Sequence, residues 1–107
     1  RHRGQGLMFA VTITFSIRLG QQAGFMKALD AHIADVVSAP TGCIRAEAYG
    51  DPARPGKVML VQVFGASEEF EDYRAGSLAK GFDSKVVDIV TARSIATWTE
   101  VIEARPS

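Results

Sequence analysis

Hydrophobic and polar residues alternate regularly near the start of the chain. From residue 9 to residue 17, large apolar side chains fall on one face and small or hydroxylic side chains on the other. A period of two residues is typical of a β-strand, so we predict a strand over Phe9–Ile17. Its second face carries no charge, which favours partial burial against another layer or subunit; this face comprises Ala10, Thr12, Thr14 and Ser16.

The pattern changes to a helical period after Gly20. Between residues 21 and 38, apolar side chains recur at three- and four-residue spacing and form one stripe, made of Phe25, Leu29, Ile33 and Val36. This spacing predicts an amphipathic helix. His32 lies close to the stripe, and Pro40 and Gly42 are expected to end the helix.

Two runs rich in β-forming residues follow, Cys43–Tyr49 and Lys57–Gly65. The segment between them, residues 50–56, contains two glycines and two prolines and is predicted to be a turn. After the second run, Ser67 is followed by two glutamates, a composition that is favoured at a helix N-terminus.

This second helical region contains Gly76 and Gly81, so we predict a break near residues 76–77. A resumed helix is expected over about residues 82–91, and a last strand over residues 94–102. Residues 103–107 are expected to form a frayed tail.

The predicted order is β-α-β-β-α-β, the ferredoxin-like arrangement of an α+β protein. Right-handed crossovers would place both helical regions on one face of a four-stranded antiparallel sheet. The other face is too apolar for a fully hydrated surface, since it would carry Ala10, Thr12, Thr14, Met59, Val61, Val63 and Ala96. We therefore predict a homodimer that joins sheet to sheet.

Length and composition indicate one domain. The chain has 107 residues, of which we assign 8–103 to the domain, 1–7 to an N-terminal extension before a natural start at Met8, and 104–107 to a tail. Twelve basic and twelve acidic residues balance, so no global charge favours nucleic acid or an anionic membrane. Because Cys43 is the single cysteine and no signal peptide or membrane span is recognisable, we expect a cytoplasmic protein.

Three short motifs carry a resemblance to a known family. They are the turn Pro40-x-Gly42-Cys43, the strand Val61-Gln62-Val63-Phe64 and the helix start Ser67-Glu68-Glu69-Phe70. In this order and spacing, residues 8–103 resemble the antibiotic biosynthesis monooxygenase domain. The resemblance implies a dimeric α/β barrel with a pocket between helices and sheet in each subunit. It also implies that no cofactor is needed, because some members oxidise phenolic or quinol substrates with O2 and neither metal nor flavin.

The chain departs from the family pattern at several positions. Tyr73 stands where many members carry a histidine, Gly76 where a serine often follows, and Phe64 where many have tryptophan. The related haem-degrading branch relies on an asparagine, and this chain has none. We therefore do not expect haem degradation.

Two residues are candidates for proton transfer. His32 is the only histidine within the domain, and its ordinary pKa suits a base near neutral pH. Tyr73 could donate a hydrogen bond to a developing oxyanion. Purely structural roles are the alternative: a half-buried helix histidine for His32 and an amphipathic core-edge residue for Tyr73.

Candidate substrate-binding residues are Phe64, Trp98 and Tyr49, although packing alone would also explain the first two. Cys43 is interpreted as a packing residue, on the same strand face as Arg45, Glu47 and Tyr49. No His, Cys or Asp spacing predicts a metal site.

The leading hypothesis is a cofactor-independent monooxygenase that acts on a small aromatic, phenolic or quinol molecule. The alternative is a non-catalytic dimeric protein on the same scaffold that binds a small molecule or is associated with stress. The absence of the family histidine favours the alternative, and O2 consumption would separate the two.

Overall fold

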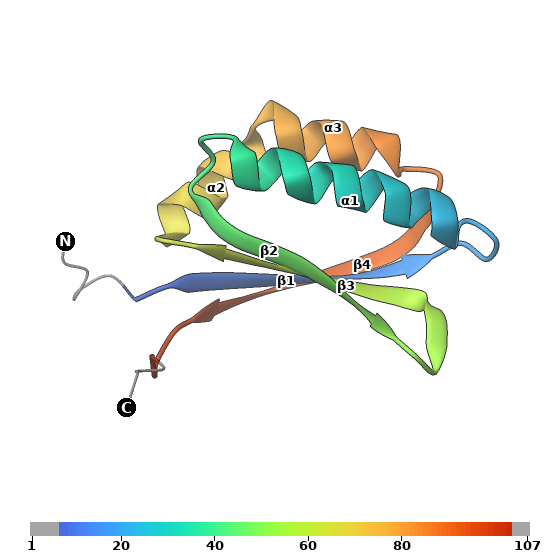
Figure 1. Cartoon of the computed structure of the whole chain (residues 1–107), viewed down its shortest axis with the longest axis horizontal. Helices are drawn as coiled ribbons and strands as arrows, with labels where there is room; N and C mark the ends of the chain where they lie inside the picture. The colour runs from blue at the N-terminus through green and yellow to red at the C-terminus, as the bar shows by residue number, and fades with distance from the viewer. Residues whose placement is uncertain (1–6, 104–107) are drawn as a thin grey trace.

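The computed structural model describes residues 7–103 and contains four strands and three helices within that range. Figure 1 labels them in chain order. Their bounds are β1 Phe9–Ile17, α1 Gln22–Ser38, β2 Cys43–Asp51, β3 Arg54–Phe64, α2 Ser67–Ala75, α3 Ser77–Lys85 and β4 Val90–Thr99.

The four strands form one antiparallel sheet in the order β2-β3-β1-β4. All three helices lie over one face of this sheet, and the other face is left uncovered (Figure 1). This arrangement confirms the predicted α+β, ferredoxin-like fold. It also creates an interior between the helices and the sheet in which buried polar side chains can meet.

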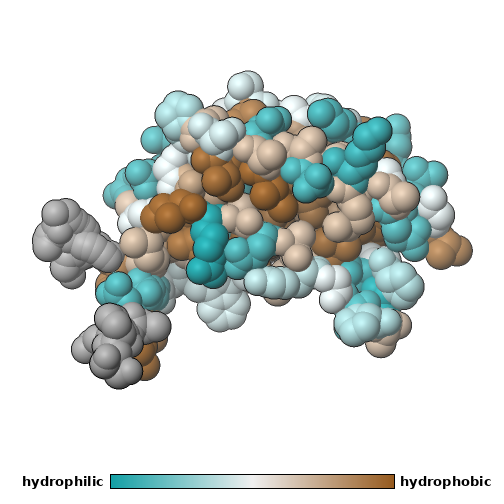
Figure 2. Space-filling view, viewed as in Figure 1, coloured by the Kyte–Doolittle hydropathy of each residue, from teal (hydrophilic) through white to brown (hydrophobic). Residues whose placement is uncertain are grey.

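The core forms where the apolar face of β1 packs against the apolar stripe of α1. Alternate residues of β1 are buried, as its pattern predicted, and α1 buries Phe25, Leu29, His32 and Val36. Ile33 of the predicted stripe is only partly buried, and His32 lies in the core in its place. In Figure 2, apolar side chains gather along the seam between the helices and the sheet.

The β2–β3 hairpin is longer than predicted. Residues 50–56 were expected to form the turn, but the strands extend to Asp51 and Arg54, so the turn consists of residues 52–53. The Asp51 carboxylate closes it by accepting bonds from the Ala53 amide and the Arg54 side chain, both at 2.9 Å. Pro55 falls where the register shifts, between the pairs Asp51–Arg54 and Gly50–Val58, so its missing N–H is tolerated.

The predicted break in the second helical region is confirmed. Gly76 has extended backbone between α2 and α3. The helix predicted at 82–91 was wrong, since α3 begins at Ser77 and ends at Lys85. The last strand begins at Val90 rather than residue 94 because β4 pairs with the whole of β1, from Ile17–Val90 to Phe9–Thr99.

The predicted placement of Cys43 on one face of β2 was also wrong. Cys43 was placed on the same face as Arg45, Glu47 and Tyr49, but the register of β2 shifts between Cys43 and Arg45. This irregularity at Ile44 leaves Cys43 buried in the core, while Tyr49 points to the uncovered face.

The predicted terminal segments lie almost entirely outside the described residues, since these exclude 1–6 and 104–107. Within residues 7–103, no helix has the length and apolar character that crossing a lipid bilayer requires.

Candidate active site

A histidine and a tyrosine from different helices meet in the interior. His32 of α1 and Tyr73 of α2 are only 6% and 9% exposed, and His32 Nε2 lies 2.6 Å from the Tyr73 hydroxyl oxygen. Each residue faces the sheet because it shares a helical stripe with apolar neighbours, Leu29 and Val36 for His32 and Phe70 for Tyr73. The structure therefore brings together the two residues that the sequence proposed for proton transfer.

A cavity of about 150 Å³ lies beside this pair, between the helices and the sheet. Both His32 and Tyr73 line it. Most of the other lining side chains are apolar or aromatic, and the full set comprises Ile13, Phe15, Leu60, Phe70, Arg74, Ala79, Phe82, Asp83, Arg93 and Ile95. A largely apolar chamber with a few convergent polar groups is typical of a small-molecule site.

Arginines and one carboxylate stand at the rim of this cavity. Arg93 of β4 pairs with Asp83 of α3 at 3.0 Å, and its guanidinium lies 5.7 Å from the centre of the Phe15 ring. Arg74 lies in the same way over the Phe70 ring, at 5.5 Å. These contacts fix the arginines against aromatic faces and place positive charge around the cavity.

Burial keeps the His32–Tyr73 pair uncharged near neutral pH. Desolvation lowers the pKa of His32 below 6.5, although the carboxylates of Asp35 and Asp83 act in the opposite direction. Desolvation also raises the pKa of Tyr73. The imidazole is further held in place by stacking on Phe82, with ring centres 4.5 Å apart. A neutral imidazole and a neutral phenol can share one proton along their hydrogen bond.

Gln62 is the polar residue behind Tyr73. It is 1% exposed, lies on the helix-facing side of β3, and its side-chain hydrogen bonding lowers the pKa of Tyr73 against the effect of burial. Its Oε1 atom has no protein partner among the described residues. A buried amide beside a buried phenol is costly to maintain, which is typical of a functional site.

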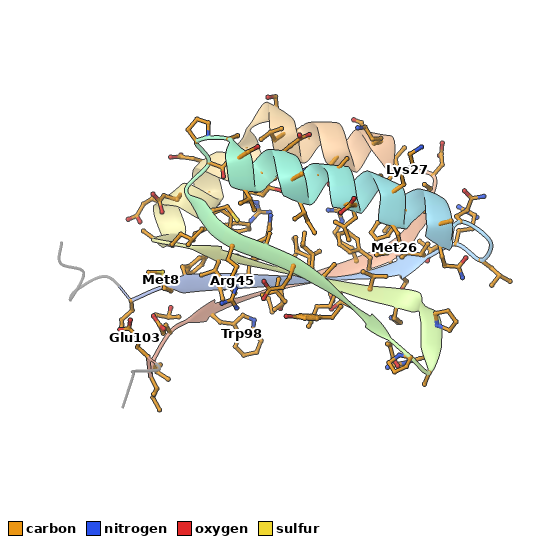
Figure 3. The ribbon with its side chains drawn as sticks, in the orientation of Figure 1. Met8, Met26, Lys27, Arg45, Trp98 and Glu103 are labelled. Carbon is orange, nitrogen blue, oxygen red and sulfur yellow. The ribbon has the colours of Figure 1, made fainter. Side chains whose placement is uncertain are left out.

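The three predicted substrate-binding residues do not line the cavity. Phe64 is fully buried, and its ring packs behind Tyr73 with centres 5.7 Å apart. Tyr49 and Trp98 are on the opposite face of the sheet, 48% and 57% exposed. Figure 3 shows Trp98 pointing away from the helices, and its indole N–H donates to Thr12 at 3.1 Å. The structure thus separates Tyr49 and Trp98 from the histidine–tyrosine pair.

Sequence reasoning missed several residues that surround the pair. Phe82 was not named as a site residue, Gln62 appeared only within the strand motif, and Asp83 and Arg93 were not singled out. Gln62 could have been found from its pattern, because it alternates with Leu60 and Phe64 and so falls at a core position. Nothing in the sequence signalled the pairing of Asp83 with Arg93.

Other reactive groups are poorly placed for catalysis. Burial raises the pKa of the Cys43 thiol, whose Sγ donates to the Arg45 carbonyl at 3.3 Å, so the thiolate nucleophile is disfavoured. Within residues 7–103, no group of three or more His, Cys, Asp or Glu side chains is arranged to hold a metal ion.

Comparison with solved structures shows the same fold in several bacterial proteins. A Nitrosomonas europaea protein assigned to the antibiotic biosynthesis monooxygenases superposes with a TM-score of 0.83 at 14% identity, covering 91% of this chain and 93% of its own. A Shewanella oneidensis protein gives 0.81 at 22% identity, covering 92% and 95%. A Mycobacterium tuberculosis protein gives 0.80 at 18% identity, covering 92% and 99%. At these identities the similarity establishes the fold alone.

Sequence comparison identifies the family. A search of curated proteins found no significant match. The sequence profile of the family described as "antibiotic biosynthesis monooxygenase" matches residues 8–84, a range that includes α1, α2 and the histidine–tyrosine pair between them. This match covers most of the chain and confirms the resemblance first suggested by the three short motifs. The chain belongs to the antibiotic biosynthesis monooxygenase family.

Proposed function

We propose that this protein is a cofactor-independent monooxygenase that oxidises a single-ring phenol or hydroquinone with O2. The observation that carries the proposal is the buried His32–Tyr73 hydrogen bond at the wall of an aromatic cavity. Membership of the monooxygenase family supports the reaction class. The substrate and the roles of the two residues rest on the chemistry of the cavity.

Cavity size limits the substrate to one ring. A volume of about 150 Å³ equals that of an engineered apolar protein cavity that binds benzene. The rings of Phe15, Phe70 and Phe82 offer flat walls to such a molecule. A fused three-ring substrate such as an anthrone does not fit without rearrangement of the helices.

The pair supplies the base that this chemistry requires. Reaction of a phenol with O2 is faster from the electron-rich phenolate, so the hydroxyl proton must be removed in the cavity. Neutral His32 can accept the Tyr73 proton at Nε2 while the Tyr73 oxygen accepts the substrate proton. One oxygen atom then enters the ring and the other leaves as water. The substrate supplies all the electrons, and a hydroquinone becomes a hydroxylated quinone.

We further propose a cytoplasmic homodimer that joins the uncovered sheet faces. This face carries the exposed rings of Tyr49 and Trp98 beside the partly buried side chains of Met59, Val61 and Val63. Covering them removes apolar surface from water. The helix-facing side of β4 is also exposed, at Arg93 and Ile95, and these two side chains line the cavity.

The test is O2 consumption. Purified protein is incubated with methylhydroquinone, hydroquinone and catechol in an oxygen electrode, with a chelator present, and products are identified by mass spectrometry. We expect uptake above autoxidation and incorporation of one labelled oxygen atom from 18O2. An anthrone serves as the oversized control and is expected to be a poor substrate.

Tyr73→Phe protein is the matched negative control, because it removes one oxygen atom and keeps the ring. Uptake that is equal in wild-type and Tyr73→Phe protein would contradict the proposed role of the pair. Thermal stabilisation by these compounds without any O2 uptake would instead identify a binding protein on the same scaffold.

A further inference from the structure

His32 lies between two separate hollows. On one side is the inner cavity already described, and on the other is a cleft between α1 and α3 of about 140 Å³, here called the outer cleft. The outer cleft is lined by His32 and Phe82, which also line the inner cavity, together with Ala28, Asp35, Ser77, Leu78, Gly81 and Lys85. The stacked rings of His32 and Phe82 thus form a wall shared by the two hollows.

We propose that His32 passes the substrate proton from the inner cavity to the outer cleft, where Asp35 is the acceptor that connects it to solvent. This inference rests on the proposed function, since it names the route by which the substrate proton leaves that site. It assigns roles to Asp35 and to the outer cleft that the family assignment does not provide.

The route follows from the bonds that the pair already makes. The substrate O–H breaks as the Tyr73 oxygen gains a proton, and the Tyr73 proton moves to His32 Nε2 across 2.6 Å. The resulting imidazolium must lose a proton before the next turnover. Nε2 is occupied by Tyr73, so Nδ1 is the nitrogen that remains for release. A release back into the inner cavity would return the proton to the substrate side.

The charged groups around His32 favour release of its proton into the outer cleft. Asp35 lies one helical turn after His32 on the same helix, is exposed, and lines the outer cleft. The carboxylate that lines the inner cavity is Asp83, which is already paired with Arg93, and Arg74 adds positive charge there. Lys85 also lines the outer cleft and opposes protonation of His32. Asp35 is therefore the carboxylate best placed to draw the proton out.

Gly81 provides a way to close the outer cleft. It lies in α3, lines the cleft, and a Cβ at this position would meet no atom within 4 Å. Gly81→Leu therefore fills the cleft without a backbone clash and improves helix propensity. Gly24→Leu is the matched control, because Gly24 lies in α1, has the same open surroundings and is not part of the cleft.

The first measurement needs no turnover. The ring N–H of 15N-labelled His32 is followed by NMR, and its hydrogen exchange with water is compared in wild type, Gly81→Leu and Gly24→Leu. We expect Gly81→Leu to slow exchange about tenfold, because exchange then requires local opening. Gly24→Leu should exchange as wild type does. Equal exchange in Gly81→Leu and wild type would overturn the route.

The second measurement uses turnover of the hydroquinone substrate. Asp35→Asn should lower kcat about fivefold, a modest loss for a group that accepts the proton after the reacting atoms. Added formate, which is small enough for the outer cleft, should restore the rate in Asp35→Asn but not in Asp35→Asn/Gly81→Leu. Asp30→Asn, an exposed carboxylate on the same helix outside the cleft, is the control and should keep the wild-type rate.

The two measurements separate the possible failures. Absence of turnover in wild type refutes the proposed function, while NMR exchange still decides whether the outer cleft connects His32 to water. Normal turnover in Asp35→Asn, or formate rescue that survives the filled cleft, would refute the proton route and leave the proposed function intact.

Discussion

His32 Nε2 and the Tyr73 hydroxyl oxygen lie 2.6 Å apart, although 41 residues separate them in the sequence. Neither residue is near the other in any local motif, and the contact depends on how α1 and α2 pack over the sheet. Both side chains are buried, so the hydrogen bond forms away from competing water. This pair is the feature of the fold that most directly suggests chemistry.

Tyr73→Phe and His32→Gln should each reduce kcat by about a hundredfold, the scale of a lost acid–base group. The double variant should lose little more than either single variant, because the two residues act as one unit. The comparison requires kcat for methylhydroquinone in all four proteins at one pH. Losses that multiply in the double variant would show two independent functions.

The free energy of unfolding should fall as the pH is lowered through the titration of His32. Burial lowers its pKa in the folded state, so the unfolded chain takes up the proton first as pH falls below 6.5. The contribution of neutral His32 is therefore complete above 6.5 and is lost as pH falls from 6.5 to the lowered folded-state pKa. Urea unfolding of wild type and His32→Gln between about pH 7.5 and pH 5 measures the effect.

In that experiment, the free energy of unfolding of wild type should decline more steeply than that of His32→Gln. Tyr73 is neutral throughout this range because its pKa is raised by burial. Parallel curves for the two proteins would show that His32 keeps its ordinary pKa in the folded state.

Gln62→Leu should retain or increase stability while reducing turnover. The substitution removes a buried Oε1 atom that has no protein partner among residues 7–103, and such a group costs about 1–3 kcal/mol. It also removes the amide that lowers the pKa of Tyr73, so the phenol becomes less able to share its proton. Chemical denaturation and kcat provide the two readouts. A large loss of stability would show that Gln62 is a structural residue.

The fold could be predicted because its main signals are local. Phe9–Ile17 alternates along its whole length, and the α1 stripe repeats over more than three turns, so both elements were found within one residue of their bounds. The α3 and β4 bounds were missed because the start of β4 depends on its pairing with Ile17, a partner far away in sequence. Local patterns do not encode such pairing.

The residues of the candidate site were likewise only partly predictable from the sequence. His32 and Tyr73 could be proposed from their residue types, and Tyr73 from the family pattern. Tyr49 and Trp98 were expected to shape the pocket because they are aromatic, although a period of two residues already places Trp98 on the same face as Ala96, the face predicted to be away from the helices. The side chain of Trp98 faces away from the helices because the pairing Ala10–Trp98 sets its phase along β4.

Gly42→Ala should destabilise the protein, whereas Gly24→Ala should stabilise it. Gly42 has φ of +81°, and a Cβ there would lie 2.8 Å from the Glu69 side chain. Strain of this kind costs about 1–3 kcal/mol. At Gly24 a Cβ meets nothing within 4 Å, and alanine in a helix gains about 0.5–1 kcal/mol over glycine. Thermal unfolding of the two variants beside wild type checks the opposite signs.

Val61→Asp should convert the proposed dimer into a monomer. Val61 lies in the middle of the uncovered sheet face, opposite Thr12 on β1 and Glu47 on β2. In a sheet-to-sheet dimer, its aspartate would be buried directly opposite the carboxylate of Glu47, at a cost that exceeds the stability of a modest interface. Val37→Asp is the control, because Val37 is exposed on α1, on the helix side of the molecule. Size-exclusion chromatography with light scattering should give a dimer for wild type and Val37→Asp and a monomer for Val61→Asp. A wild-type monomer would refute the proposed dimer.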